Sequence, residues 1–182
     1  MDYLVKAEEV KMVHKLKWII ILILSKFFGE NIKVKYFRKS GLIIGGGGCR
    51  IYSDIVTSEP FLIEIGENVT ISTDVTFVTH DNSIIKVNKE LPNLYGKIRI
   101  GNNCFIGERA ILMYGVSIPN NTIVAAGSVV TKSISEERVI LGGNPAKVIS
   151  TWDKFYDKNK NKGISKFKIK EIYDQEEKLV RR

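Results

Sequence analysis

Residues 100–134 read IGNNCFIGERAILMYGVSIPNNTIVAAGSVVTKSI and place a large aliphatic residue at every sixth position. A helix repeats every 3.6 residues and an ordinary strand every two, so neither predicts this spacing. The large positions are Ile100, Ile106, Leu112, Ile118, Val124 and Val130, and the mostly small residues four positions later are Cys104, Ala110, Val116, Thr122, Ser128 and Ile134. A six-residue period is typical of a coiled parallel β-structure, in which each hexad forms one flat side and one corner.

The repeat extends toward the N-terminus and is interrupted once. It begins irregularly at Ile51–Ile55, becomes regular over Ile65–Phe77, and returns at Ile100. Residues 81–97 fit no hexad, and an excursion of 17 residues from so regular a scaffold is more often functional than accidental. At three hexads per turn, residues 100–135 make two complete 18-residue coils, and the earlier hexads predict about two more.

The chain's 182 residues and net charge of +8 predict one domain with basic appendages. Residues 1–39 carry a net charge of +5 and residues 151–182 one of +4, whereas residues 40–150 carry −1. Basic ends favour contact with an anionic partner, and a solvated surface is the alternative. Nucleic acid is not predicted, because the middle of the chain has no recognition motif. Cys49 and Cys104 are predicted to be buried small side chains rather than disulfide partners.

The first 40 residues predict an amphipathic helix over 3–28 and a lead-in. Its apolar face comprises Met12, Val13, Leu16, Ile19, Ile20, Ile23 and Phe27. The densest apolar run, 18–24, is too short to cross a bilayer, which takes about 20 residues. Two interpretations stay open: the helix packs on the protein or a neighbouring subunit, or it lies in the plane of a membrane surface. No cleavable signal is recognised, so a cytoplasmic setting, with peripheral contact to the inner membrane face as an option, is expected.

Two further segments complete the predicted organisation. Residues 41–150 hold the coil, and residues 151–182 predict a basic terminal helix or tail that is broken near Gly163. The run Gly45–Gly48 lacks the Gly-Lys-Ser/Thr that follows in a phosphate-binding loop, so it predicts a tight turn where the coil begins.

Five segments carry signatures beyond the hexad spacing: IGENVTIS (65–72), FVTHD (77–81), IGNNCFIG (100–107), AAGSVVTK (125–132) and GGNPAK (142–147). Together they resemble the hexapeptide-repeat acyltransferases, and in particular the maltose and galactoside O-acetyltransferases and the acetyltransferases of polysaccharide clusters. The resemblance covers residues 42–150. It implies an all-β core in the form of a left-handed parallel β-helix, an exception to the usual right-handed crossover. It also implies a homotrimer with active sites between neighbouring subunits.

His80 is the predicted general base. The chain has two histidines, and His14 lies among lysines in the predicted N-terminal helix, where it is expected to be a surface residue. His80 ends a regular hexad and opens the excursion, which places it at a coil edge with a loop above it. Histidine titrates in the neutral range, as a base for an alcohol acceptor requires. The resemblance implies this role, with direct attack of the acceptor on acetyl-CoA; a structural histidine at a coil corner is the alternative.

The resemblance implies acetyl-CoA as cosubstrate, bound beside the later coils. The expected cofactor-binding residues are Phe105, Gly107, Ala125, Ala126, Thr131, Lys132 and Lys147. The two alanines leave room for the pantetheine arm, Thr131 and Lys132 are expected to meet the nucleotide, and Lys147 the phosphates. Phe105 stands where many relatives carry Trp, a departure that concerns acceptor specificity.

The expected acceptor-binding residues are Asp54, Asp81, Asn82 and Tyr95. Asp81 follows His80 directly and is expected either to orient the acceptor or to form a turn. No metal is expected, because one histidine in the coil argues against a three-histidine zinc site.

The predicted function is therefore O-acetylation of a carbohydrate hydroxyl, in surface polysaccharide synthesis. A sugar N-acetyltransferase and an antibiotic acetyltransferase are alternatives within the same chemistry. A non-catalytic β-helix scaffold is the alternative from another class, although it would not need His80, the excursion and the Thr131-Lys132 pair together.

Overall fold

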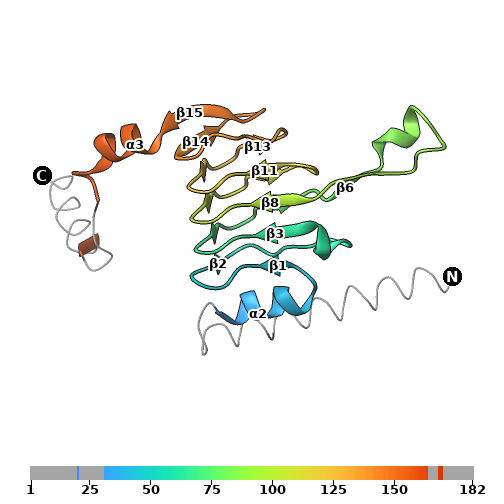
Figure 1. Cartoon of the computed structure of the whole chain (residues 1–182), viewed down its shortest axis with the longest axis horizontal. Coiled ribbons are helices and arrows are strands. Elements are labelled where there is room, and N and C mark those ends of the chain that lie inside the picture. The colour runs from blue at the N-terminus through green and yellow to red at the C-terminus, as the bar shows by residue number, and fades with distance from the viewer. Residues whose placement is uncertain (1–19, 21–30, 164–167, 170–182) are drawn as a thin grey trace, which may run out of the picture. The chain divides into compact units, whose positions relative to one another are not determined.

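Strands stacked in three sheets form a coil in the computed structural model (Figure 1), which describes residues 20, 31–163 and 168–169. Sheet A contains β1 (Ile43–Ile44), β3 (Ile63–Ile65), β8 (Ile98–Ile100) and β11 (Ser117–Ile118). Sheet B contains β2 (Arg50–Ile51), β4 (Thr70–Ile71), β9 (Phe105–Ile106), β12 (Ile123–Val124), β14 (Val139–Gly142) and β15 (Lys147–Thr151). Sheet C contains β5 (Thr76–Phe77), β10 (Ile111–Leu112) and β13 (Val129–Val130). The chain visits sheets A, B and C in turn, which is the three-sided mostly-β architecture that the hexads predict.

The strand register places the excursion between two coils without disturbing either. Ile71 pairs with Ile106 in parallel, and Ile106 pairs with Val124 in parallel. The first pair is 35 positions apart and the second 18, and the difference of 17 equals the length expected for the excursion.

The large residue of each hexad fills one continuous core. Ile106, Leu112 and Val124 have no exposed surface, and the other large positions are at most 2% exposed. The smaller positions are buried as well, apart from Ile134, which is only partly covered. Burying one such aliphatic side chain contributes roughly 1.5–3 kcal/mol. The six-residue period is therefore the repeat of inward-facing side chains.

A ladder of asparagine side chains ties the corners between sheets A and B. Asn68 Nδ2 donates to Asn103 Oδ1 and Asn103 Nδ2 to Asn121 Oδ1, each at 2.8 Å. Asn121 Nδ2 then donates to Glu137 Oε2 at 3.1 Å. The three asparagines have φ between 52° and 56°, the left-handed region that asparagine tolerates better than most residues.

Asn103→Ala is expected to lower the free energy of unfolding by about 1–2 kcal/mol, because it removes two hydrogen bonds and forces alanine into the left-handed region. Asn103→Gly removes the same hydrogen bonds without the backbone strain and should cost less. Chemical denaturation measures both variants. Equal losses would show that φ contributes nothing here, and no loss in either would show that the ladder is not stabilising.

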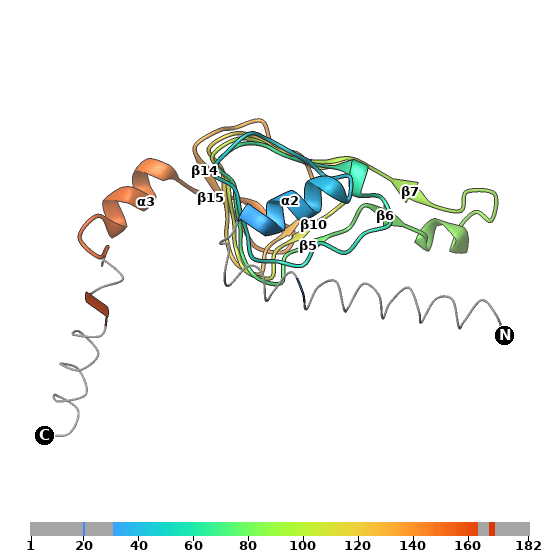
Figure 2. The ribbon, with the colours of Figure 1, turned by 90° about the horizontal axis from the view of Figure 1, so that it is seen from below.

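The excursion forms an arm at one edge of the coil. Its strands β6 (His80–Asp81) and β7 (Leu94–Tyr95) pair antiparallel, and the 3₁₀ helix η2 (Ser83–Lys86) lies between them. Seen along the coil, the arm extends away from the stacked sheets (Figure 2). Val87 and Leu91, toward its tip, are exposed.

A short helix, α2 (Asn31–Lys39), covers the first coil. Val34 and Phe37 are buried against the core, and Arg38 donates to the carbonyl oxygens of Ile44 (3.2 Å), Gly45 and Gly46 (3.2 Å). The four-glycine run is thus the turn between β1 and β2. The sequence predicted only a lead-in where α2 stands, so this helix was missed. The helix expected over 3–28 lies outside the described residues except for Ile20.

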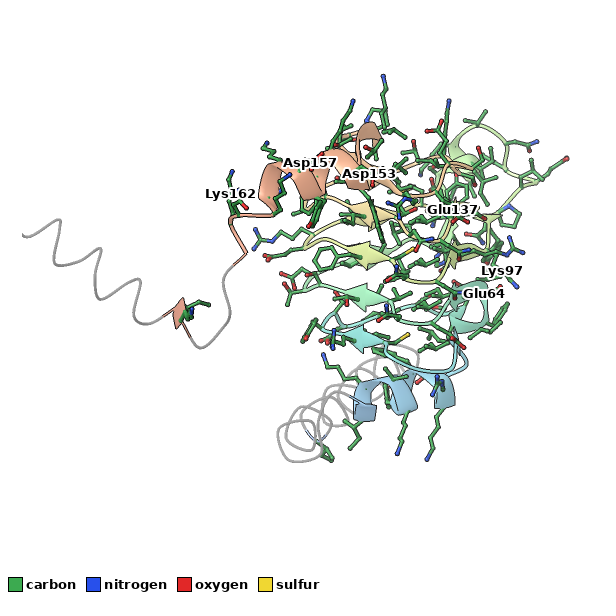
Figure 3. The ribbon with its side chains drawn as sticks, turned by 60° about the vertical axis from the view of Figure 1, so that its left-hand side comes forward. Glu64, Lys97, Glu137, Asp153, Asp157 and Lys162 are labelled. Atoms are coloured by element: carbon green, nitrogen blue, oxygen red, sulfur yellow. The ribbon has the colours of Figure 1, made fainter. Side chains whose placement is uncertain are left out.

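The described residues fall into two compact units, within 1–149 and within 150–182. In the second unit, α3 (Trp152–Asn159) begins where Thr151 Oγ1 accepts from the Lys154 N–H at 3.4 Å. Its charged surface includes Asp153 and Asp157 (Figure 3). The charged helix expected here therefore ends at Asn159, ahead of Gly163. Among the described residues no helix has the length and apolar character that crossing a bilayer requires.

Candidate active site

His80 stands where the chain leaves sheet C for the arm. It is the first residue of β6, and 42% of its side chain is exposed. Nδ1 lies 2.8 Å from Glu59 Oε2, and among the described residues no partner is assigned to Nε2. One imidazole nitrogen is thus held by the protein and the other is available to a substrate.

Glu59 reaches His80 from the preceding coil. It lies between β2 and β3, directly before the 3₁₀ helix η1 (Pro60–Leu62), and 15% of its side chain is exposed. Glu59 Oε2 also accepts from Thr79 Oγ1 at 2.8 Å and from Thr57 Oγ1 at 3.4 Å. Burial by itself raises the pKa of the Glu59 carboxyl, but the hydrogen bonds from Thr79 and His80 outweigh burial, and the pKa is lowered. Glu59 is therefore a carboxylate at neutral pH.

The lowered pKa of Glu59 makes part of the stability dependent on pH. A carboxyl with a depressed folded-state pKa stabilises the protein above its unfolded pKa, and that contribution is lost as the pH falls through the folded value. The difference in melting temperature between the wild type and Glu59→Gln should be constant above about pH 5 and shrink below it. Thermal denaturation across this range measures it. A difference that grows on acidification would contradict the assigned direction.

Tyr95 lies across the arm from His80. The two residues are opposite each other in the β6–β7 pair, with ring centroids 5.7 Å apart and an interplanar angle of 44°. The Tyr95 side chain is 57% exposed, so its ring forms one wall beside the imidazole.

Asp81 serves the turn rather than the imidazole. Its Oδ1 accepts from the Ser83 N–H at 2.8 Å, and this hydrogen bond holds the pKa of Asp81 below its usual range. Asn82 lies at the start of η2. Of the two roles expected for Asp81, the contacts support the turn.

Thr131 and Lys132 share the edge of the coil that carries His80. β5, β10 and β13 are neighbours in sheet C, and the residues that follow them stack at one corner. His80 follows β5, whereas Thr131 and Lys132 follow β13, two coils further along, and both are exposed. The chain therefore presents a base and a cation on one edge.

The other expected site residues lie elsewhere on the coil. Phe105 faces outward from sheet B and is 43% exposed, and Lys147 is the exposed first residue of β15. Asp54 follows β2 and pairs with Lys33 of α2, Nζ to Oδ1, at 3.5 Å. The remaining three, Gly107, Ala125 and Ala126, lie at the corner between sheets B and C. One subunit does not bring these residues to His80.

Gly107 has a packing role that the sequence did not indicate. A Cβ at this position would lie 2.5 Å from Ala126 N and 2.7 Å from Val124 O, so the two coils approach too closely for any side chain. Gly107 N donates to Val124 O at 2.8 Å across the same contact. The geometry accounts for glycine here without a ligand.

Sequence reasoning missed Glu59 and its two threonine partners. The hexad period gave no signal, because the first coil is irregular: Ile51 pairs with Ile71, 20 positions away, instead of 18. Without a fixed register, nothing places Glu59 beside His80. Within the described part of the chain no group of three His, Cys, Asp or Glu side chains is arranged to hold a metal.

Comparisons with known proteins agree with this architecture. Residues 97–132 match the family model described as the hexapeptide repeat of succinyl-transferase. Protein CapG of Staphylococcus aureus is 42% identical over 138 residues, covering 73% of this chain and 79% of CapG. Galactoside O-acetyltransferase of Escherichia coli K12 is 31% identical over 125 residues, covering 66% of this chain and 61% of that protein.

Solved structures share the fold. The crystal structure of a maltose O-acetyltransferase from Clostridium difficile 630 superposes with a TM-score of 0.52 at 26% identity, covering 66% of this chain and 75% of that one. The Vibrio cholerae acetyltransferase VCA0836, in complex with acetyl coenzyme A, gives 0.54 at 21% identity, covering 79% and 88%. At that identity the second likeness bears on the fold alone.

Proposed function

Since this chain belongs to the hexapeptide-repeat acetyltransferases, we propose that it transfers the acetyl group of acetyl-CoA directly to a hydroxyl group of a carbohydrate, with His80 as the general base. The observation that carries this is the half-exposed imidazole, whose Nδ1 is held by Glu59 and whose Nε2 is available. The names of the galactoside and maltose O-acetyltransferases support a carbohydrate acceptor.

The proposed step needs no covalent enzyme intermediate. His80 Nε2 takes the proton of the acceptor hydroxyl as that oxygen attacks the thioester carbonyl. The tetrahedral intermediate collapses with cleavage of the carbon–sulfur bond, and the imidazolium returns the proton to the departing sulfur. The products are an acetyl ester and the CoA thiol, and the enzyme is restored.

The arrangement of the expected residues supports a site shared between subunits. His80, Thr131 and Lys132 occupy the edge between sheets C and A, whereas Gly107, Ala125 and Ala126 occupy the edge between sheets B and C. Both sets contact one acetyl-CoA only if a second subunit presents its edge to the first. We therefore propose a homotrimer of left-handed coils, in which Lys147 and Phe105 also reach the cofactor. Light scattering tests this, and a monomeric mass would exclude the shared site.

The proposed biological setting is surface polysaccharide synthesis on the cytoplasmic side of the membrane. The basic ends suit work on a lipid-linked glycan, because anionic headgroups attract nearby lysines. Nucleic acid is not a proposed partner.

An amine acceptor is the second candidate. Glu59 places a carboxylate 2.8 Å from His80, and such a partner also suits proton removal from an amino group. An N-acetylated amino sugar or antibiotic would then be the product.

Acetyl-CoA turnover across a panel of mono- and oligosaccharides and amino sugars tests the proposal, with mass spectrometry to identify the acetylated product. An ester on a sugar supports the first candidate, and an amide the second. Turnover with no acceptor in the panel would favour the non-catalytic scaffold.

The thiol-detecting readout of this assay should report CoA alone. Cys49 and Cys104 are buried, and burial raises the pKa of the Cys104 thiol to about 11. Neither cysteine is expected to react with a thiol reagent at about pH 8 in the native protein, and both should react after denaturation. Mass spectrometry of the treated protein measures this. Labelling of Cys104 in the folded state would contradict its burial.

A further inference from the structure

The carboxylate of Glu59 belongs to a closed circuit of hydrogen bonds. Thr79 Oγ1 donates to Glu59 Oε2 at 2.8 Å, and the Thr57 and Thr79 hydroxyl oxygens are 2.7 Å apart. The circuit closes where the Glu59 backbone N–H donates to Thr57 Oγ1 at 3.1 Å. Thr79 is 3% exposed, so its hydroxyl depends on these protein partners rather than on water.

The proton count of the circuit leaves one arrangement. Thr79 has a single hydroxyl proton, and it is used toward Glu59, so Thr57 donates to Thr79 across the 2.7 Å contact. Thr57 in turn accepts from the Glu59 N–H. Every donor and acceptor is matched in one direction around the ring, which fixes Glu59 Oε2 in place.

The same count assigns the protons of the imidazole. Glu59 Oε2 has no proton to give, because its pKa is lowered, so the 2.8 Å contact requires a proton on His80 Nδ1. In a neutral imidazole Nε2 then carries the lone pair. A histidine without such a partner would place the lone pair on either nitrogen.

We infer that Glu59 is the positioning residue for His80, and that the circuit through Thr79 and Thr57 fixes the imidazole in the tautomer that presents the Nε2 lone pair. The inference rests on the proposed function for its kinetic consequence only. Glu59 touches neither acceptor nor cofactor in this scheme and acts through His80, in the way that outer carboxylates orient histidines elsewhere. Thr79 and Thr57 hold Glu59 at the required distance.

The first experiment reads the tautomer without substrate. The full chain has two histidines, so His14→Gln leaves His80 as the single source of histidine ring ¹⁵N signals. At a pH where the ring is neutral, the Nδ1–H tautomer is expected in this background and a shift toward Nε2–H when Glu59→Ala is added. An Nε2–H tautomer at the outset, or an unchanged spectrum in Glu59→Ala, would overturn the inference.

The second experiment separates the circuit from general packing. Thr79→Val keeps the shape of the side chain and removes its hydroxyl, and is expected to lower kcat about 10-fold with KM values unchanged, whereas Glu59→Ala lowers it about 100-fold. Thr79→Ser should restore kcat, and the matched control Thr122→Val alters a buried threonine of another coil without effect on kcat.

These outcomes keep the two proposals distinct. A wild-type rate in Thr79→Val and Glu59→Ala, with turnover intact, would overturn the positioning role while acetyl transfer stands. The expected tautomer and its loss in Glu59→Ala, in a protein with no turnover on any acceptor, would uphold the positioning role while the proposed function fails.

Discussion

His80→Ala is expected to lower kcat for acetyl transfer about 10²- to 10⁴-fold, the range that a positioned general base supplies. Without Nε2, the acceptor hydroxyl has only water to take its proton as it attacks the thioester. The KM for acetyl-CoA should change little, because the expected cofactor contacts lie on later coils. Release of the CoA thiol in the presence of the identified acceptor measures both constants.

The change in rate should not come from unfolding. The His80 side chain lies at the coil edge, 42% exposed, and is absent from the apolar core. Its removal should therefore leave the melting temperature within a few degrees of the wild type, as for other exposed positions. His14→Ala is the matched control, because it removes the chain's other histidine and should keep the wild-type kcat. Equal rates in the two variants would exclude His80 as the base.

Gly107→Ala is expected to lower the free energy of unfolding by about 3 kcal/mol, at the upper end of the cost of overpacking. The added methyl would meet the backbone of the next coil, 2.5 Å from Ala126 N, and backbone cannot rotate away as a side chain can. Relief requires the coils to separate, which breaks the hydrogen bond from Gly107 N to Val124 O. Chemical denaturation of the two proteins measures the loss.

Gly47→Ala provides the comparison. A Cβ at Gly47 would meet nothing within 4 Å, and Gly47 is not among the glycines with positive φ. Its stability should stay within about 0.5 kcal/mol of the wild type. A stable Gly107→Ala protein with a raised KM for acetyl-CoA would instead favour the cofactor-binding role that the sequence suggested for this glycine.

Periodicity predicted the parts of the fold that repeat. Ile106 has neighbours of the same kind above and below, Ile71 and Val124, and that equivalence is what the six-residue spacing records. It also located His80, because the residue stands where the period stops. A break in an otherwise regular pattern is visible in a sequence even when its purpose is not.

The features that sequence reasoning missed depend on contacts that do not repeat. Glu59 meets His80 only through the register of an irregular first coil, and no spacing encodes that register. The helix α2 is nine residues long and places Lys33 among its buried positions, which obscures its apolar face. Lys33 is accommodated because its Nζ donates to the Tyr52 carbonyl oxygen at 2.9 Å, a contact specific to the folded chain.

The arm leaves the strand pairing on either side of it intact, and this separates the evolution of the scaffold from that of its acceptor. Closing a longer loop is cheap, since doubling its length costs about 0.6 kcal/mol in chain entropy. Arms of different length and composition are therefore interchangeable on one coil, with His80 and Tyr95 as the fixed points of attachment. A lineage built this way can acquire a new sugar by exchanging some 17 residues, while the machinery that handles the thioester stays as it was.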